Sequence, residues 1–300
     1  MTPLGVYLRG VLMGAADIVP GVSGGTMAFI TGIYDRLLDS IRSFDLRCLR
    51  LLWQRRFRAA WGHVDGGFLL ALVLGIFTSI LSLARLLSWL LAEYPVPLWA
   101  FFFGLILASA LVLLRQVPHW TLPRAICLLV GLLLAAGIAL SPVVAMAPGL
   151  PGIFVAGFIA ICAMILPGIS GSFILILLGM YGPVLSAVKN LQLDVMAVFA
   201  LGAGLGLMCF SRLLHWLLQR FHVATMALLT GFLFGSLLVV WPWKHALDWV
   251  LGSDGELRPA QQVPVWPWQF AAEPHLPLCV ALMVAGFVLV WLVERRWGGG

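Results

Sequence analysis

PGVSGG at residues 20–25 and PGISGS at residues 167–172 are two copies of one unusual hexapeptide, 147 residues apart. Aligning residues 10–41 with residues 157–188 without a gap gives ten identities, so the match extends well beyond the hexapeptide. The chain therefore contains an internal duplication. Its helix-breaking Pro-Gly-x-Ser-Gly element is the place where we expect the function to lie.

The register of the duplication shifts once along the chain. RLLSWLL at residues 85–91 matches RLLHWLL at residues 212–218, at an offset of 127 rather than 147 residues. The difference arises because the first half carries an extra basic segment over residues 42–63. We predict a first repeat over residues 1–145 and a second repeat over residues 148–297.

The composition is that of an integral membrane protein. Hydrophobic residues make up 62% of the chain and charged residues only 10%, with a mean hydropathy of +1.05. A soluble domain would carry about 25% charged residues. The net charge of +6 comes mainly from arginines at loop ends, which does not indicate nucleic acid as a partner. The five cysteines show no metal-binding spacing, and we expect no bound cofactor.

Six apolar runs are long enough to be full transmembrane helices. They cover residues 66–92, 97–115, 123–141, 194–218, 222–241 and 276–293. The two motif regions, residues 4–40 and 151–188, differ because each holds two apolar arms of about 16 residues joined by the Pro-Gly break. Such a region is either a re-entrant hairpin or one broken crossing. Irregular backbone at that depth must be buried in protein or line a cavity.

The distribution of charge favours the hairpin. If each motif region enters and leaves on one side, each half has three net crossings, and the second half is inverted relative to the first. With the basic segment placed in the cytoplasm, most other arginines also fall inside, and the acidic loop at residues 242–275 becomes periplasmic. We therefore predict an all-α integral membrane protein of two inverted-topology repeats with both termini cytoplasmic. Each repeat has one re-entrant or broken helix pair plus three transmembrane helices.

The basic segment admits two interpretations. It is either an ordinary cytoplasmic loop that sets the topology or an amphipathic helix that lies on anionic lipid.

A helix restarts just after each Pro-Gly break, and the residues there suit an anion. The first turn of a helix exposes unpaired N–H groups that bind phosphate or carboxylate, and glycine lets the anion approach the backbone. We predict phosphate binding at Ser23, Gly24, Gly25 and Thr26 in the first copy and at Ser170, Gly171 and Ser172 in the second. The structural alternative is a capped kink with no ligand.

Charged residues within the apolar runs are few, and three of them are candidates for a functional role. Arg85 and Arg212 are equivalent in the two halves and are candidate phosphate ligands, or else they reach back to the nearest membrane interface. Asp17 lies three residues before Pro20, and its repeat partner is Met164. An intramembrane carboxylate at this position either couples transport to a proton or sodium gradient or forms an ion pair.

Two stretches carry a resemblance to a known family, namely GAADIVPGVSGGTMAFITGIYDRLLDSI at residues 14–41 and LPGISGSFILILLGMYGPVL at residues 166–185. They resemble the bacterial polyprenyl-phosphate transporter family, formerly a domain of unknown function. The resemblance implies a flippase that moves undecaprenyl phosphate from the outer to the inner leaflet of the inner membrane. This transport recycles the carrier lipid for the peptidoglycan of the cell envelope. The implied partners are the lipid and the bilayer, and the oligomeric state is open, with a homo-oligomer among the alternatives.

Two other functions compete with lipid transport. One is a carrier for a small soluble anion. A lateral opening wide enough for a prenyl chain would indicate a flippase and not such a carrier. The other is an undecaprenyl-diphosphate phosphatase, a family that carries an arginine within its Pro-Gly-x-Ser motif. Here Gly24 and Gly171 follow the serines, and all four glutamates lie in loops or at span ends. A serine nucleophile would therefore lack an evident base, so we predict a transporter and not an enzyme.

Overall fold

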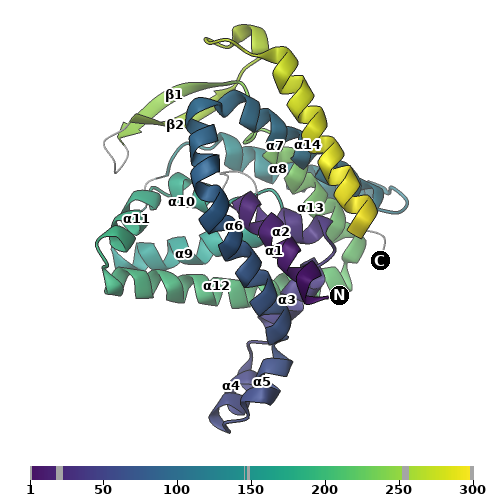
Figure 1. The fold of residues 1–300 in the computed structure, drawn as a ribbon, viewed down its shortest axis with the longest axis vertical. Helices are drawn as coiled ribbons and strands as arrows, with labels where there is room; N and C mark the ends of the chain where they lie inside the picture. Colours follow the sequence, from purple (N-terminus) through teal and green to yellow (C-terminus); the bar gives the residue numbers. More distant parts are fainter. Residues whose placement is uncertain (1, 18–22, 145, 147–148, 252–256, 298–300) are drawn as a thin grey trace.

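The computed structural model describes residues 2–17, 23–144, 146, 149–251 and 257–297. Figure 1 shows a helical bundle with a pair of short helices protruding at one end and a two-stranded hairpin at the other. The first half contains α1 (Pro3–Asp17), α2 (Gly24–Ile30), α3 (Tyr34–Arg42), α4 (Leu46–Trp53), α5 (Phe57–His63), α6 (Gly66–Glu93), α7 (Pro95–Arg115) and α8 (Leu122–Leu140). The second half contains α9 (Leu150–Ile165), α10 (Gly171–Leu177), α11 (Tyr181–Lys189), α12 (Leu193–Arg220), α13 (His222–Ser236) and α14 (Leu276–Trp297).

Among the described residues, five helices are long and apolar enough to cross a membrane, namely α6, α7, α8, α12 and α14. The chain is therefore a multi-pass membrane protein with a helical fold, as predicted. The run at residues 222–241 is the exception, because its helix ends at Ser236. With 15 residues, α13 extends only about 22 Å, which is less than the thickness of a typical hydrocarbon core.

Each motif region contains a turn in addition to its Pro-Gly break. The arm after each break is divided in two, into α2 and α3 in the first half and α10 and α11 in the second. Gly32 and Gly179 lie at the divisions, both with φ of 68°, a conformation that side chains other than glycine rarely adopt. α10 and α11 meet at 111°, the geometry of a broken span or a re-entrant loop. The sequence indicated the Pro-Gly break but not this second turn.

The two halves use the same helix packing. α1 packs along α6 in the first half, and α9 packs along α12 in the second. A Cβ atom added at Gly75 would lie 2.2 Å from the Tyr7 carbonyl oxygen, and one added at Gly202 would lie 2.1 Å from that of Phe154. Gly75 and Gly202 are equivalent positions in the duplicated sequence, as are Tyr7 and Phe154. Two further close pairs, α7 with α14 and α8 with α13, cross between the halves and join them into one bundle.

The basic segment forms the two protruding helices α4 and α5 (Figure 1). Several of its large apolar side chains are exposed, including Leu46 at 83% and Trp53 at 89%. Exposed leucine and tryptophan beside arginine are typical of a helix at a membrane interface. The structure therefore favours the interfacial interpretation over a plain loop.

The loop at residues 242–275 contains the only β-strands among the described residues. β1 (Lys244–Leu251) pairs antiparallel with β2 (Leu257–Pro264), and the short helix η1 (Pro267–Gln269) follows. Aromatic rings gather beneath this hairpin, where Trp241 stands edge-on to both Trp243 and Trp266. The Lys244 ammonium donates to the Val239 carbonyl and lies 4.2 Å from the centroid of the Trp99 ring.

Replacing Lys244 with Met should stabilise the protein at pH 6 more than at pH 10. Burial lowers the pKa of Lys244 to about 7, whereas an unfolded lysine titrates near 10.4. Between these values the unfolded chain binds the proton that the folded chain has released, so the unfolding free energy of the native protein rises with pH. The variant lacks this dependence, and thermal melts at the two pH values measure the difference. An equal effect at both values would contradict the prediction.

Candidate functional site

Ser23 of the first motif bonds both within its own hairpin and across to the other half. Its hydroxyl accepts the Gly25 N–H at 3.1 Å and caps α2, while it donates to the Met164 carbonyl at 3.0 Å. Ser23 is 1% exposed. The Pro-Gly break of this copy, at residues 20–21, lies outside the described residues.

Asp17 closes the first hairpin at its break. A carboxylate oxygen of Asp17, at the end of α1, accepts the Gly24 N–H at the start of α2, over 2.7 Å. A Cβ atom at Gly24 would lie 2.4 Å from that carboxylate, so glycine is needed for the approach. Asp17 thus occupies the backbone donor that the sequence analysis assigned to a phosphate. No ion pair of Asp17 with an arginine is present among the described side chains.

The two motifs meet at the centre of the bundle. The Gly168 N–H in the second motif donates to the Thr26 hydroxyl at 3.0 Å. The hydroxyl of Tyr34, at the start of α3, donates to the Ile165 carbonyl at 3.0 Å, just before the second Pro-Gly break. Thr26 is fully buried and Tyr34 is 4% exposed. The structure therefore brings together two elements that lie about half the chain apart.

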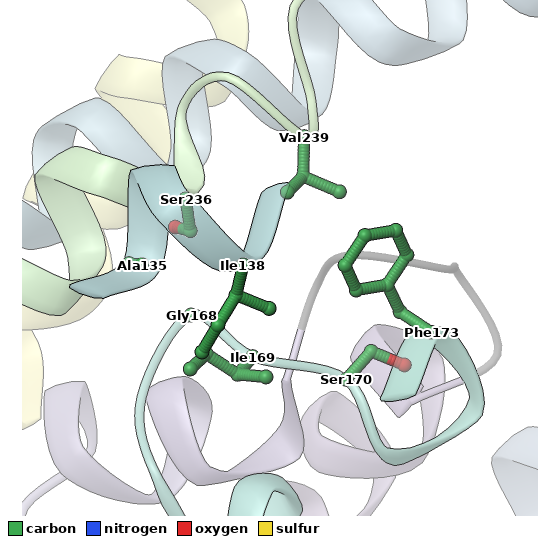
Figure 2. Close-up of a pocket in the computed structure, with 8 residues that line it drawn as sticks. All are labelled: Ala135, Ile138, Gly168, Ile169, Ser170, Phe173, Ser236 and Val239. Atoms are coloured by element: carbon green, nitrogen blue, oxygen red, sulfur yellow. The ribbon is translucent and has the colours of Figure 1, made fainter. Parts of the chain in front are cut away.

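The second motif has a different set of contacts. The Ser170 hydroxyl lies 2.8 Å from the Ser172 hydroxyl and makes no capping bond to α10. Figure 2 shows Ser170 and Phe173 facing a small cavity across from Ser236 and Val239. The cavity measures about 10 Å³, which is room for about one water molecule. The cavity is therefore too small to hold a phosphate beside Ser170 unless the surrounding helices separate.

A larger cavity adjoins the first motif. It has a volume of about 190 Å³ and lies among α1, α2, α6, α7 and α14. All of its lining side chains are apolar, including Ala16 beside Asp17 and Met27 beside Thr26. An apolar cavity of this kind stays dry and accepts hydrocarbon.

The two predicted arginine ligands lie away from the motifs in this structure. Arg85 is exposed on α6. Arg212 is exposed on α12, where its guanidinium donates to the Met208 carbonyl one turn earlier. Arg212 also lines a groove of about 320 Å³ together with Leu46 and Leu49 of α4. The structure thus joins Arg212 to the interfacial helix and not to the serines.

Two polar contacts that hold α3 in place were not predicted from the sequence. Tyr34 was not singled out, although Tyr34 and Tyr181 are identical in the repeat alignment, which is a usable signal. His215 was assigned no role, yet its Nδ1 lies 3.0 Å from an Asp39 carboxylate oxygen. No local pattern links α3 to α12, so only the tertiary structure could find this pair. Within the described ranges, no group of three or more His, Cys, Asp or Glu side chains is arranged to hold a metal ion.

Comparison with known proteins identifies the family. The family described as undecaprenyl phosphate translocase-like matches residues 13–258. A polyprenyl-phosphate transporter of Vibrio cholerae serotype O1 is 47% identical over 299 residues, which cover 98% of this chain and 97% of that protein. A polyprenyl-phosphate transporter of Staphylococcus aureus is 31% identical over 256 residues, with 78% and 85% covered. No solved structure matches the chain. With a family match over most of its length and the paired motifs in contact, the chain belongs to the undecaprenyl phosphate translocase-like family of membrane transporters, which are not enzymes.

Proposed function

We propose that this protein moves undecaprenyl phosphate from the outer to the inner leaflet of the bacterial inner membrane. The family and both relatives support a polyprenyl phosphate as the substrate. A charged headgroup crosses hydrocarbon at high cost, and the role of the protein is to replace its hydration with fixed donors.

The observation that carries the proposal is the direct contact between the two motifs. Ser23 bonds to the backbone at Met164, and Thr26 bonds to Gly168. These bonds gather two sets of hydroxyls and glycine N–H groups in the interior of the bundle. One anion could therefore be passed from one set to the other without leaving the protein.

The proposed phosphate ligands are Ser23, Gly24, Gly25 and Thr26 on one side and Ser170, Gly171 and Ser172 on the other. The Asp17 carboxylate now holds the Gly24 N–H. A phosphate and an ionised Asp17 cannot share this donor, since like charges repel at such short range. Protonation of Asp17 would remove the negative charge that repels phosphate from this donor, and this exchange provides a coupling to the proton gradient, with sodium as the alternative ion. Arg85 and Arg212 would attract the headgroup at the ends of its path.

The apolar cavity beside the first motif favours a lipid over a small soluble anion. It places about 190 Å³ of purely apolar space next to the proposed phosphate ligands. A soluble anion has no hydrocarbon that could fill this space. A lipid phosphate has a prenyl chain that begins at its headgroup and could occupy it.

We propose that the two halves are inverted repeats with both termini in the cytoplasm. The arginine-rich α4 and α5 lie at the opposite end of the molecule from the β1–β2 hairpin (Figure 1). This separation agrees with a cytoplasmic basic segment and a periplasmic loop at residues 242–275. It also agrees with six net crossings, three in each half.

Purified protein in proteoliposomes with undecaprenyl phosphate tests the function. The measurement is the exposure of the headgroup in each leaflet, with and without a pH or sodium gradient. Relocation that depends on the protein would support the proposal. Flux of inorganic phosphate in its place would indicate a soluble-anion carrier, and release of phosphate from undecaprenyl diphosphate would indicate a phosphatase.

Replacing Ser170 and Ser172 together with Ala should lower transport at least about tenfold and leave the melting temperature nearly unchanged. Their hydroxyls bond mainly to each other, so few structural contacts are lost, whereas a charged hydrogen bond to phosphate is worth about 1.5–3 kcal/mol. Ser82→Ala is the control, because this hydroxyl donates to its own helix. Normal transport by the folded double variant would remove these serines from the site.

A further inference from the structure

The two hairpin tips match in sequence but differ in what they contact. The tip formed by α2 and α3 packs against α9 and α12 of the other half, as well as α7 and α14. The tip formed by α10 and α11 packs chiefly against α9 and α12 of its own half. α10 shares an apolar cluster with α8 and α13. α11, however, makes no contact with α6 comparable to that of α3 with α12, in the part of the chain that the structure describes. In the first tip α3 is docked across the molecule, and in the second tip its equivalent α11 is not.

The equivalent tyrosines Tyr34 and Tyr181 differ in the same way. Tyr34 is 4% exposed and donates to the Ile165 carbonyl in the other half. Its partner Tyr181 is 36% exposed, and no hydrogen bond to its hydroxyl is present among the described residues. One residue type at one repeat position thus has two environments in a single molecule.

A contact between a histidine and a carboxylate accompanies the docked tip. Asp39 on α3 lies 3.0 Å from His215 on α12, and the repeat partners of these two residues are Ser186 and Ser88. Two serines offer neither a carboxylate nor an imidazole for such a contact. The docked state of the first tip is therefore favoured by a contact that the second tip lacks.

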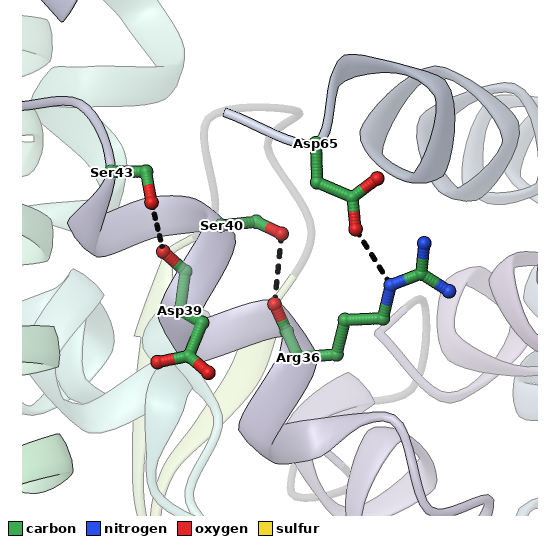
Figure 3. A network of polar contacts seen from close by, with 5 residues as sticks. All are labelled: Arg36, Asp39, Ser40, Ser43 and Asp65. Atoms are coloured by element: carbon green, nitrogen blue, oxygen red, sulfur yellow. Dashed lines mark hydrogen bonds and ion pairs between the residues drawn. The ribbon is translucent and has the colours of Figure 1, made fainter. Parts of the chain in front are cut away.

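The opposite side of α3 is fixed to its own half. Figure 3 shows Arg36 extending to Asp65, at 2.7 Å, while the Asp39 carboxylate points away from this pair. α3 is therefore held between α6 and α12. The repeat partner of Arg36 is Pro183, which offers no such bond to α11.

We propose that the α2–α3 tip and the α10–α11 tip are alternating gates, and that Tyr34 and Tyr181 are the positioning residues that hold each gate in its docked state. The inference deepens the proposed function and rests on its inverted repeats. In an inverted repeat, exchanging the conformations of the two halves produces the same structure facing the other membrane side. The structure is then the state in which the cytoplasmic gate is docked.

The segment between the repeats permits the second tip to move. The N–H groups of Val144 and Met146 donate to the carbonyls of Leu177 and Leu178 at the end of α10. These residues lie between α8 and α9 and outside any helix. Val144 and Met146 would therefore move with the second tip when that tip docks.

Paired cysteines test the exchange in a background from which the five native cysteines have been replaced. Asp39→Cys with His215→Cys should be crosslinked by a short bis-thiol reagent in the state described here. Ser88→Cys with Ser186→Cys, the repeat-equivalent pair, should be crosslinked in the exchanged state. Either crosslink should block transport, and a reducible reagent should restore it. Tyr7→Cys with Thr78→Cys is the control, because these side chains touch within one half at 3.1 Å and their crosslink should leave transport intact.

Single substitutions of the tyrosines should shift the two crosslinks in opposite directions. Tyr34→Phe removes a bond of the present state and should raise Ser88–Ser186 crosslinking severalfold, since one hydrogen bond corresponds to a factor of about five. Tyr181→Phe should lower it by a similar factor. A merely structural role would give changes in the same direction for both variants.

The crosslinking needs no substrate, so it separates the gates from the function. Exchange of the crosslinks without lipid transport would refute the proposed substrate and leave the gates standing. Transport of undecaprenyl phosphate with no Ser88–Ser186 crosslink, or with undiminished activity of the Asp39–His215 crosslinked protein, would overturn the gates alone.

Discussion

Gly202→Leu is expected to prevent correct packing of the second half and to lower the unfolding free energy by about 3 kcal/mol or more, the upper end of overpacking costs. The Cβ atom alone would lie 2.1 Å from the Phe154 carbonyl oxygen and 2.9 Å from its carbon. Both groups are backbone, so no side-chain rotation relieves the clash. α9 would have to move away from α12, and the second motif follows α9 directly.

A position on the same helix provides the control for Gly202→Leu. A Cβ atom at Gly204 would have no other atom within 4 Å, so Gly204→Leu should be tolerated. The measurement is the melting temperature and the monodisperse fraction of each variant in detergent. Equal behaviour of the two variants would contradict the packing described here. Gly75→Leu should reproduce the Gly202 defect, because its Cβ would lie 2.2 Å from the Tyr7 carbonyl oxygen.

Asp17→Asn is expected to keep the fold and to lose gradient-driven transport at least about tenfold. The Asn side chain retains a carbonyl oxygen that can accept the Gly24 N–H, and Asn is among the best capping residues. It cannot gain or lose a proton, so the charge beside the proposed phosphate ligands no longer responds to a proton gradient. Leaflet exposure of undecaprenyl phosphate, measured with and without a pH gradient, tests this expectation.

Asp17→Ala distinguishes the charge from the hydrogen bond. It removes the acceptor altogether and should lower stability by about 1 kcal/mol in addition to the loss of transport. Gradient-driven transport by Asp17→Asn at the native rate would show that Asp17 only caps α2. The proposed coupling would then have to lie elsewhere, while the capping bond of the structure would still hold.

The hydrophobic runs were predictable because they depend on local sequence. Five of the six predicted spans are helices long enough to cross a membrane, since a long apolar run in lipid must satisfy its own backbone. The sixth, at residues 222–241, yielded the shorter α13. The turns at Gly32 and Gly179 were not predicted, because a single glycine within an apolar run does not by itself indicate a positive φ.

The phosphate site stays a prediction, and the structure shows that several of its groups already have partners within the protein. Thr26 bonds to Gly168 of the second motif, and Ser23 bonds to Met164 just before it. The sequence offered no sign that Asp17 would take the Gly24 N–H or that Arg212 would face α4. Contacts of this kind depend on how helices pack.

The sequence by itself determined the membrane class, the duplication and the positions of the breaks, because hydropathy, repetition and proline act over short stretches of chain. The tertiary structure alone decided that the two copies are not used alike. Tyr34 is buried against Ile165 while Tyr181 is exposed, although the two share one repeat position. The reason is that the burial of a hairpin depends on contacts between residues far apart in the chain, such as Tyr34 with Ile165, and the local sequence does not encode these contacts.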